Sequence, residues 1–150
     1  MPQKECFLIL GGAGLVGKQI ARRIATDTNL FPRKIVIASL FSAEVEHALA
    51  ELGKTSGDRE IEWVGEHGNI FVRSEYAEVN PRELLQDPVH REAVFADLFD
   101  KIEDAYERSH LVSLIRKHRP DVIIDSVNTS TAISYQNVYI ASNQAREQVL

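Results

Sequence analysis

Short continuous runs of hydrophobic residues alternate with hydrophobic positions at helical spacing along the first half of the chain. The continuous runs predict buried strands over residues 5–10 and 34–39, and a third run predicts one near the end, over 121–126. Apolar residues three and four positions apart predict helices over residues 15–27 and 42–52. Strands that alternate with helices are typical of a parallel sheet with helices on both faces.

The pattern between these elements is less regular. Ile61 and Trp63 alternate with polar residues, a glycine-containing segment follows over 65–68, and Ile70 and Val72 alternate again. This arrangement predicts either a hairpin that turns at the glycines or a strand preceded by an irregular edge.

Two proline pairs predict helix starts, because Asn or Asp caps a helix and proline suits its first turn. They are Asn80-Pro81 and Asp87-Pro88. The second is followed by helically spaced apolar residues, which predict one long helix: Val94, Phe95, Leu98, Ile102 and Tyr106. A short helix around residues 111–115 precedes Pro120, and residues 131–150 are predicted to be helical. Residues 80–110 therefore form a predicted helical insertion between the third and fourth strands.

A glycine-rich segment joins the first strand to the first helix. Residues 10–18 read Leu-Gly-Gly-Ala-Gly-Leu-Val-Gly-Lys. A helix N-terminus leaves backbone N–H groups unpaired, and its dipole favours negative charge, so a strand, a glycine turn and a helix together make a phosphate cradle. Glycines permit the sharp turn and the close approach of a pyrophosphate. The segment predicts a nucleotide site at Gly11, Gly12, Ala13, Gly14, Leu15, Val16 and Gly17.

The glycine spacing fits more than one nucleotide motif. Two fits indicate a dinucleotide: G-x-G-x-x-G from Gly12, and G-x-x-G-x-x-G from Gly11. A third, G-x-x-x-x-G-K ending at Lys18, is most of a P-loop, and the apolar strand that ends at Asp125 is compatible with it. However, Gln19 stands where a P-loop needs a Ser or Thr hydroxyl for Mg²⁺. The context favours a dinucleotide, with a P-loop and a purely structural turn as alternatives.

Ligands of such sheets bind beyond the carboxyl ends of the strands. No acid stands at the end of the second strand, where the ribose of NAD is usually bound, and the nearest one, Glu44, is equally explained by the next helix. Ser39 is a candidate contact for a ribose hydroxyl or a 2′-phosphate. The predicted cofactor is NADP or NAD, with a slight preference for NADP. The last strand is followed by four further candidates, for which an ordinary loop is the alternative: Ser126, Val127, Asn128 and Thr129.

Two stretches, 11–17 and the Arg-Pro-Asp-Val-Ile-Ile-Asp of 119–125, resemble the extended short-chain dehydrogenase/reductase family, the NAD-dependent epimerase/dehydratase group. The resemblance implies a Rossmann-like doubly wound parallel sheet in three α/β/α layers, an NAD(P) cofactor, and contact between residues 126–129 and that cofactor. The family's catalytic Tyr-x-x-x-Lys pair is absent from residues 1–150. The catalytic residues are therefore unknown.

Composition and charge narrow the class of protein. The chain has 150 residues, 44% of them hydrophobic and 26% charged, which is typical of one globular domain. A net charge of −5 without a basic stripe argues against nucleic acid as a partner. No apolar run reaches membrane-spanning length and no signal segment is evident, so a cytoplasmic protein without a membrane partner is expected. The five histidines lack metal-ligand spacing, so no metal is expected.

We interpret residues 1–150 as a single NAD(P)-binding Rossmann-like domain, the N-terminal part of a longer oxidoreductase or epimerase, inactive alone. The expected partners are the dinucleotide and either a second copy, in a homodimer, or a missing C-terminal half. The alternative from another class is a non-catalytic nucleotide-sensing or protein-interaction module. A P-loop phosphotransferase is the remote alternative.

Overall fold

The computed structural model describes residues 5–127, except for the side chains of Pro81 and Arg82. The helix expected over 131–150 lies outside these residues. The strands are β1 (Cys6–Leu10), β2 (Lys34–Ser39), β3 (Glu62–His67) and β4 (Val122–Asp125). The helices are α1 (Leu15–Thr26), α2 (Ser42–Leu52), α3 (Pro81–Gln86), α4 (Pro88–Phe99), α5 (Ile102–Arg108) and α6 (His110–His118), with short 3₁₀ turns η1 (Gly53–Thr55) and η2 (Ser74–Tyr76).

The four strands form one parallel sheet in the order β3-β2-β1-β4. The chain moves outward from β1 to β2 to β3 and then crosses back to place β4 on the other side of β1. This arrangement confirms the expected α/β class and the Rossmann-like doubly wound sheet. It also places the reversal of strand order between β1 and β4, where a crevice for a ligand forms in such folds.

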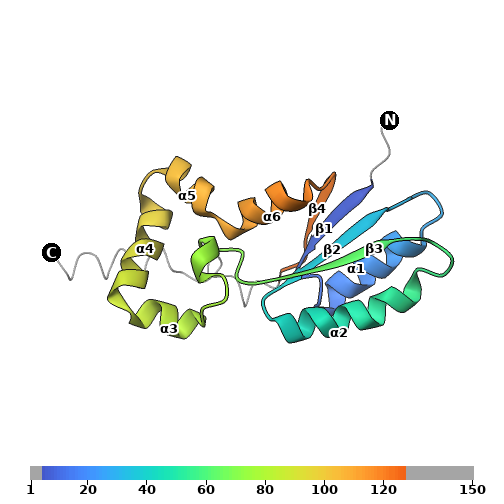
Figure 1. Ribbon diagram of the computed structural model, residues 1–150, viewed down its shortest axis with the longest axis horizontal. Helices are drawn as coiled ribbons and strands as arrows, with labels where there is room; N and C mark the ends of the chain where they lie inside the picture. Colours follow the sequence, from blue (N-terminus) through green and yellow to red (C-terminus); the bar gives the residue numbers. More distant parts are fainter. Residues whose placement is uncertain (1–4, 128–150) are drawn as a thin grey trace.

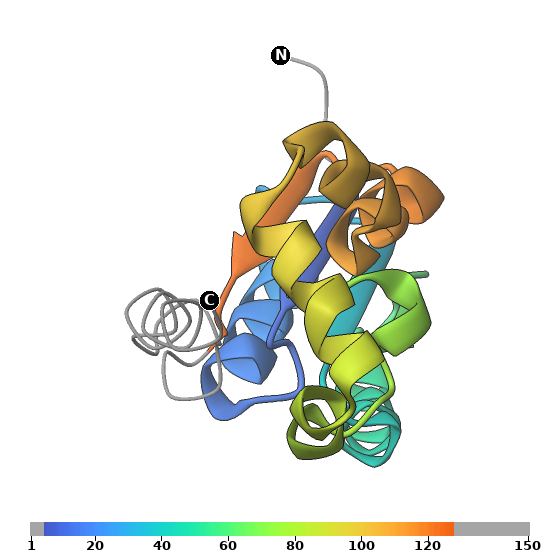
Figure 2. The same ribbon diagram turned by 90° about the vertical axis from the view of Figure 1, so that its left-hand side faces the viewer.

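Helices cover the two faces of the sheet (Figures 1 and 2): α1 and α2 lie on one face and α6 on the other. Because side chains alternate along a strand, β1 and β2 contribute to a separate core on each face. Phe7, Ile9, Ile35 and Ile37 pack with α1 and α2. Leu8, Leu10, Val36 and Ala38 pack with Leu114 of α6. Both inner strands are buried, as expected for a parallel sheet.

β3 is one continuous strand, so the predicted turn at 65–68 and the hairpin are wrong. Gly65 lies inside β3, opposite Ile37 of β2. A Cβ there would stand 2.5 Å from Val45 Cγ1 and 2.8 Å from Leu49 Cδ1, both on α2. This glycine lets a helix approach the sheet, and it does not turn the chain. The chain leaves the strand only at Gly68, the last residue of the predicted turn, which has φ +123°.

The predicted long helix after Asp87 is two helices. Asp87 caps α4 as expected, because its carboxylate accepts the N–H groups of Val89 and His90. Asp100 then leaves helical geometry, with ψ −145°, and α5 begins at Ile102. The break leaves Ile102 76% exposed, although its spacing suggests a buried position.

Helices α3–α5, called the helical annex below, are joined to the body of the protein by Arg73. Its guanidinium donates to both carboxylate oxygens of Asp97 in α4, at 2.7 and 2.8 Å, and to the Ala93 carbonyl at 2.9 Å. The same group lies 5.5 Å from the centre of the Tyr76 ring, which packs on His90. The side chains of Arg73 and Asp97 are 12% and 16% exposed, so this ion pair is largely shielded from water.

Charged groups connect α6 to β3. Lys117 Nζ donates to Glu66 Oε1 at 2.7 Å, and His118 Nε2 donates to the same oxygen at 2.6 Å. The His118 side chain is 4% exposed, and its Nδ1 has no hydrogen-bond partner among the described residues. Burial alone would raise the pKa of Glu66, but the hydrogen bonds and positive charges of Lys117 and His118 outweigh it, so that pKa lies below its usual value.

The Glu66 contacts predict an acid-dependent loss of stability. A carboxylate with a lowered pKa in the folded state stabilises that state above its unfolded pKa of about 4.3, and the stabilisation is lost as the pH falls through the folded pKa. We expect Glu66→Gln to lower the melting temperature at pH 7 by about 5 °C, equivalent to about 1.5 kcal/mol. Between pH 6 and 3, the melting temperature of this variant should fall less than that of the wild type.

Thermal melts across pH test this expectation. Glu107→Gln is the matched control, because Glu107 also pairs with a cation, Arg116, but its side chain is 64% exposed. Its removal should change the melting curve little at any pH. Equal acid sensitivity of the wild-type protein and Glu66→Gln would contradict the assignment.

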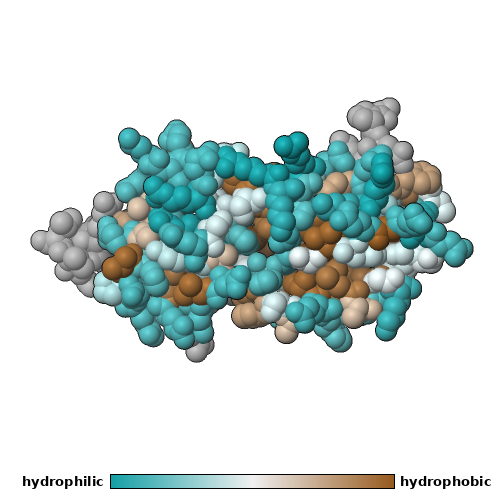
Figure 3. Space-filling view, in the orientation of Figure 1, coloured by the Kyte–Doolittle hydropathy of each residue, from teal (hydrophilic) through white to brown (hydrophobic). Residues whose placement is uncertain are grey.

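The visible surface is mainly hydrophilic over α4–α6, and hydrophobic side chains gather between β3 and α2 (Figure 3). Within residues 5–127, none of the helices combines the length and the hydrophobicity needed to cross a lipid bilayer.

Candidate functional site

The glycine turn lies at the carboxyl end of β1, and hydrogen bonds hold it against the neighbouring strands. Gly11 adopts φ +71°, which a side chain would strain. The Gly12 N–H donates to the Ala38 carbonyl of β2 at 2.9 Å, and the Gly14 N–H donates to the Gly11 carbonyl at 3.0 Å. The turn is therefore tight, and α1 begins directly after it, at Leu15.

Three of the four motif glycines are required by packing inside the protein. A Cβ on Gly11 would lie 2.8 Å from the Ser126 carbonyl oxygen, and one on Gly12 would lie 2.8 Å from that of Ile9. A Cβ on Gly17 would lie 2.4 Å from the Gly11 carbonyl oxygen. These contacts are with backbone atoms, which cannot move aside easily.

Gly14 differs from the other three. A Cβ there would meet only the Gly11 carbonyl oxygen, at 3.2 Å, and the backbone has φ −70° and ψ 169°, which any residue adopts. Backbone strain therefore does not explain why this position lacks a side chain, and a Cβ would require the Gly11 carbonyl to shift by only a few tenths of an ångström. A ligand that approaches the backbone closely would explain it, and this is the place where a Rossmann-like fold admits a pyrophosphate.

The N-terminus of α1 has the features of an anion site. Gly14 is the N-cap and offers no side-chain cap, and the first turn holds no acidic residue. The first N–H groups of the helix are then left for another acceptor. Leu15 and Val16 are 76% and 61% exposed, so their apolar side chains border this end of the helix. The predicted residues 11–17 thus surround one backbone cradle.

The lysine of the P-loop interpretation is engaged elsewhere. Lys18 Nζ donates to Glu51 Oε2 in α2 at 2.7 Å, and its side chain is 19% exposed. The Asp125 carboxylate accepts the Val127 N–H at 2.9 Å and so fixes the turn after β4. Together with Gln19, these contacts favour the dinucleotide motif over the P-loop.

The end of β2 carries a contact that the sequence does not reveal. Ser39 Oγ donates to Glu44 Oε2 at 3.1 Å. In the folded protein an acid does lie at this strand end, contrary to the expectation, because the first turn of α2 brings Glu44 close to Ser39. The only sequence signal is an acid five residues after the strand, which is also usual in the first turn of a helix.

The segment after β4 packs directly on the glycine turn. The Ser126 N–H and hydroxyl both donate to the Leu10 carbonyl, at 2.9 and 2.7 Å. Ser126 and Val127 are thus brought beside Gly11. Asn128 and Thr129 lie outside the described residues.

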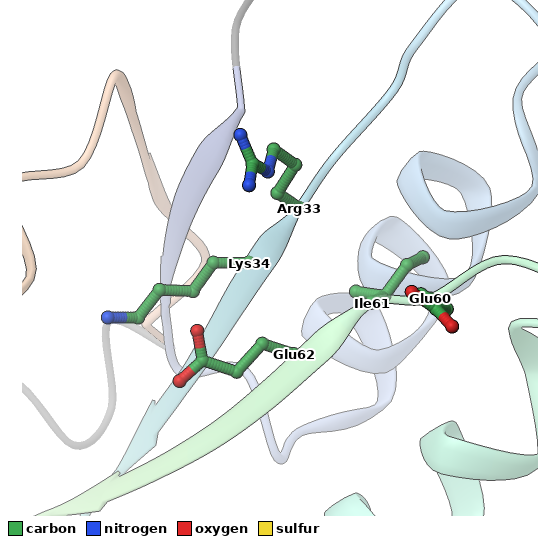
Figure 4. A pocket seen from close by; sticks show the side chains of 5 residues that line it. All are labelled: Arg33, Lys34, Glu60, Ile61 and Glu62. Carbon is green, nitrogen blue, oxygen red and sulfur yellow. The ribbon is translucent and has the colours of Figure 1, made fainter.

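A separate hollow lies at the opposite end of the sheet (Figure 4). It is lined by residues at the amino ends of β2 and β3: Arg33, Lys34, Glu60, Ile61 and Glu62. Parallel sheets bind ligands at the carboxyl ends of their strands, so this hollow is not the expected site. Arg33 and Lys34 thus lie at the end of β2 away from Ser39.

Within residues 5–127, no three His, Cys, Asp or Glu side chains gather in a way that would hold a metal ion. The groups described at the carboxyl ends of β1, β2 and β4 are backbone N–H groups, the hydroxyls of Ser39 and Ser126, and the carboxylates of Glu44 and Asp125. Such groups suit a phosphorylated sugar ligand.

Comparisons with known proteins do not identify a family for this chain. The sequence matches no family model and no curated protein. Among solved structures, it is similar to the "adenylation, ketoreductase, and pseudo Asub multidomain structure of a keto acid-selecting NRPS module", with a TM-score of 0.38 and 16% identity. The match covers 57% of this chain and 7% of that one. A likeness this weak carries no argument about function, so the assignment depends on the geometry of the site.

Proposed function

We propose that the chain binds a nicotinamide dinucleotide, NAD or NADP, with the pyrophosphate on the backbone of the glycine turn and the N-terminus of α1. The observation that carries the proposal is Gly14, where a Cβ would meet a single atom and the backbone conformation does not require glycine. The turn and the uncapped helix lie at the carboxyl end of β1, and the strand order reverses between β1 and its neighbour β4. We further propose that the chain is the cofactor-holding domain of an oxidoreductase or epimerase of the short-chain type.

The proposal assigns a role to each group of candidate residues. Residues 11–17 hold the pyrophosphate through backbone N–H groups, and Ser39 lies where the adenosine ribose would be. Ser126 and Val127 border the same cradle from β4. Hydride transfer also needs a group that gives or takes a proton, and no residue is assigned that role here. The proposed function of residues 1–150 is therefore binding.

Calorimetry with NADH and NADPH, without added metal, tests the proposal. We expect the wild-type chain to bind at least one of them, and Gly14→Val to reduce that affinity more than about 100-fold, or about 2.7 kcal/mol. The isopropyl group would occupy the space of the pyrophosphate while leaving the fold intact, which a melting curve of the variant checks.

Gly53→Val is the matched control, because a Cβ at Gly53 meets nothing within 4 Å and the residue follows the far end of α2. It should bind as the wild type does. Unchanged affinity in folded Gly14→Val, or no binding of either dinucleotide by the wild type, would overturn the proposal. Binding of ATP that requires Mg²⁺ would favour the P-loop alternative instead.

A further inference from the structure

The Ser39–Glu44 contact places a fixed negative charge at the carboxyl end of β2. Ser39 is the last residue of β2 and is half-buried, whereas Glu44 is exposed in the first turn of α2. The 3.1 Å hydrogen bond uses one lone pair of Oε2 and leaves the other acceptor positions of the carboxylate open. The carboxylate is thus oriented by a neighbour and still able to accept hydrogen bonds from a ligand.

The surroundings of Glu44 are negative. Residues 35–53 contain three glutamates, at 44, 46 and 51, and no lysine or arginine. The cationic residues of α1, the adjoining helix, are already paired: Lys18 and Arg22 with Glu51, and Arg23 with Asp27. His67, which lies beside Ser39 in the sheet, contacts Glu78 at 3.4 Å. These lysine, arginine and histidine side chains therefore have carboxylate partners and are poorly available for a phosphate at the end of β2.

We propose that Glu44, positioned by Ser39, selects a dinucleotide with a free ribose diol, and so favours NAD over NADP. This inference rests on the proposed function. The vicinal hydroxyls of the adenosine ribose donate to the carboxylate, whereas a 2′-phosphate removes one donor and brings like charge against it. The proposed preference for NAD is opposite to the slight preference for NADP that the sequence suggests. Glu44 is the specificity-determining residue, and Ser39 is its positioning residue.

Calorimetric titration of the chain with NAD⁺ and with NADP⁺ tests the inference through the ratio of the two affinities. We expect the wild type to bind NAD⁺ at least about tenfold more tightly. Glu44→Gln keeps the side-chain shape but removes the charge, and should bring the ratio close to one by weakening NAD⁺ binding and strengthening NADP⁺ binding. Ser39→Ala should shift the ratio in the same direction by a smaller factor, because the carboxylate remains but loses its anchor.

Glu46→Gln is the matched control. It removes the same charge from the same helix two residues further on, and residues two apart do not share a helix face, so the ratio should stay unchanged. A wild-type ratio near one, or a ratio that Glu44→Gln and Glu46→Gln change equally, would overturn the inference while the proposed function stands. Failure of the wild type to bind either dinucleotide would overturn both.

Discussion

Gly17→Ala is expected to lower the free energy of unfolding by about 3 kcal/mol and the melting temperature by roughly 10 °C. The new Cβ would lie 2.4 Å from the Gly11 carbonyl oxygen and 2.6 Å from the Gly12 Cα. These atoms belong to a turn that is held between β1, β2 and β4. Alanine is the better helix former by about 1 kcal/mol, but that gain is smaller than the cost of moving the turn.

Gly14→Ala is the matched control for Gly17→Ala, since both change the same motif by one methyl group. It should alter the free energy of unfolding by less than about 1 kcal/mol, because its Cβ meets a single atom at 3.2 Å. Urea denaturation of both variants measures the difference. Equal stability of the two variants would show that α1 does not pack on the turn as closely as described.

Arg73→Met is expected to have the second large effect on stability, about 3 kcal/mol, with the loss centred on the helical annex. The substitution keeps much of the aliphatic packing. It leaves the Asp97 carboxylate, 16% exposed, without the guanidinium that donates to both of its oxygens. It also removes the hydrogen bond to the Ala93 carbonyl in α4. We therefore expect α3–α5 to exchange amide hydrogens much faster, while β1 and β2 keep their protection.

Arg108→Gln is the control for this second prediction. Arg108 also reaches Asp97, at 3.5 Å, but its side chain is 47% exposed, so its loss should cost less than about 1 kcal/mol. Hydrogen exchange read peptide by peptide distinguishes the cases. Uniform loss of protection across the whole protein in Arg73→Met would show that the annex and the sheet unfold as one unit.

Local signals were sufficient to predict the elements from β1 to α2. β2 and α2 have the predicted bounds, because an apolar run between Lys34 and Ser39 and a helical repeat that ends at Leu52 depend on nearby residues alone. Gly65 misled the prediction because its role depends on Val45 and Leu49, two side chains from another element. Asp100 misled it because the apolar spacing continues across the break between α4 and α5.

The candidate site could be predicted in part. The glycine turn follows from the strand, glycines and helix in sequence order, but the difference between Gly14 and Gly17 depends on how closely α1 approaches the turn. The role of Glu44 depends on how the chain turns between β2 and α2, which brings a residue assigned to a helix back to a strand end. Neither the approach of α1 to the turn nor that of Glu44 to Ser39 can be predicted from the spacing of residues along the chain.

The central position of β1 has a consequence for the order of folding. It pairs with β2 across a gap of about 30 residues and with β4 across a gap of more than 100, and closing a longer loop costs more entropy. The segment β1–α1–β2–α2–β3 has only short connections. It also contains both partners of the two hydrogen bonds that shape the glycine turn, Gly14 to Gly11 and Gly12 to Ala38 of β2. The cradle can therefore form early, and the arrival of β4, with Ser126 against Leu10, closes it late.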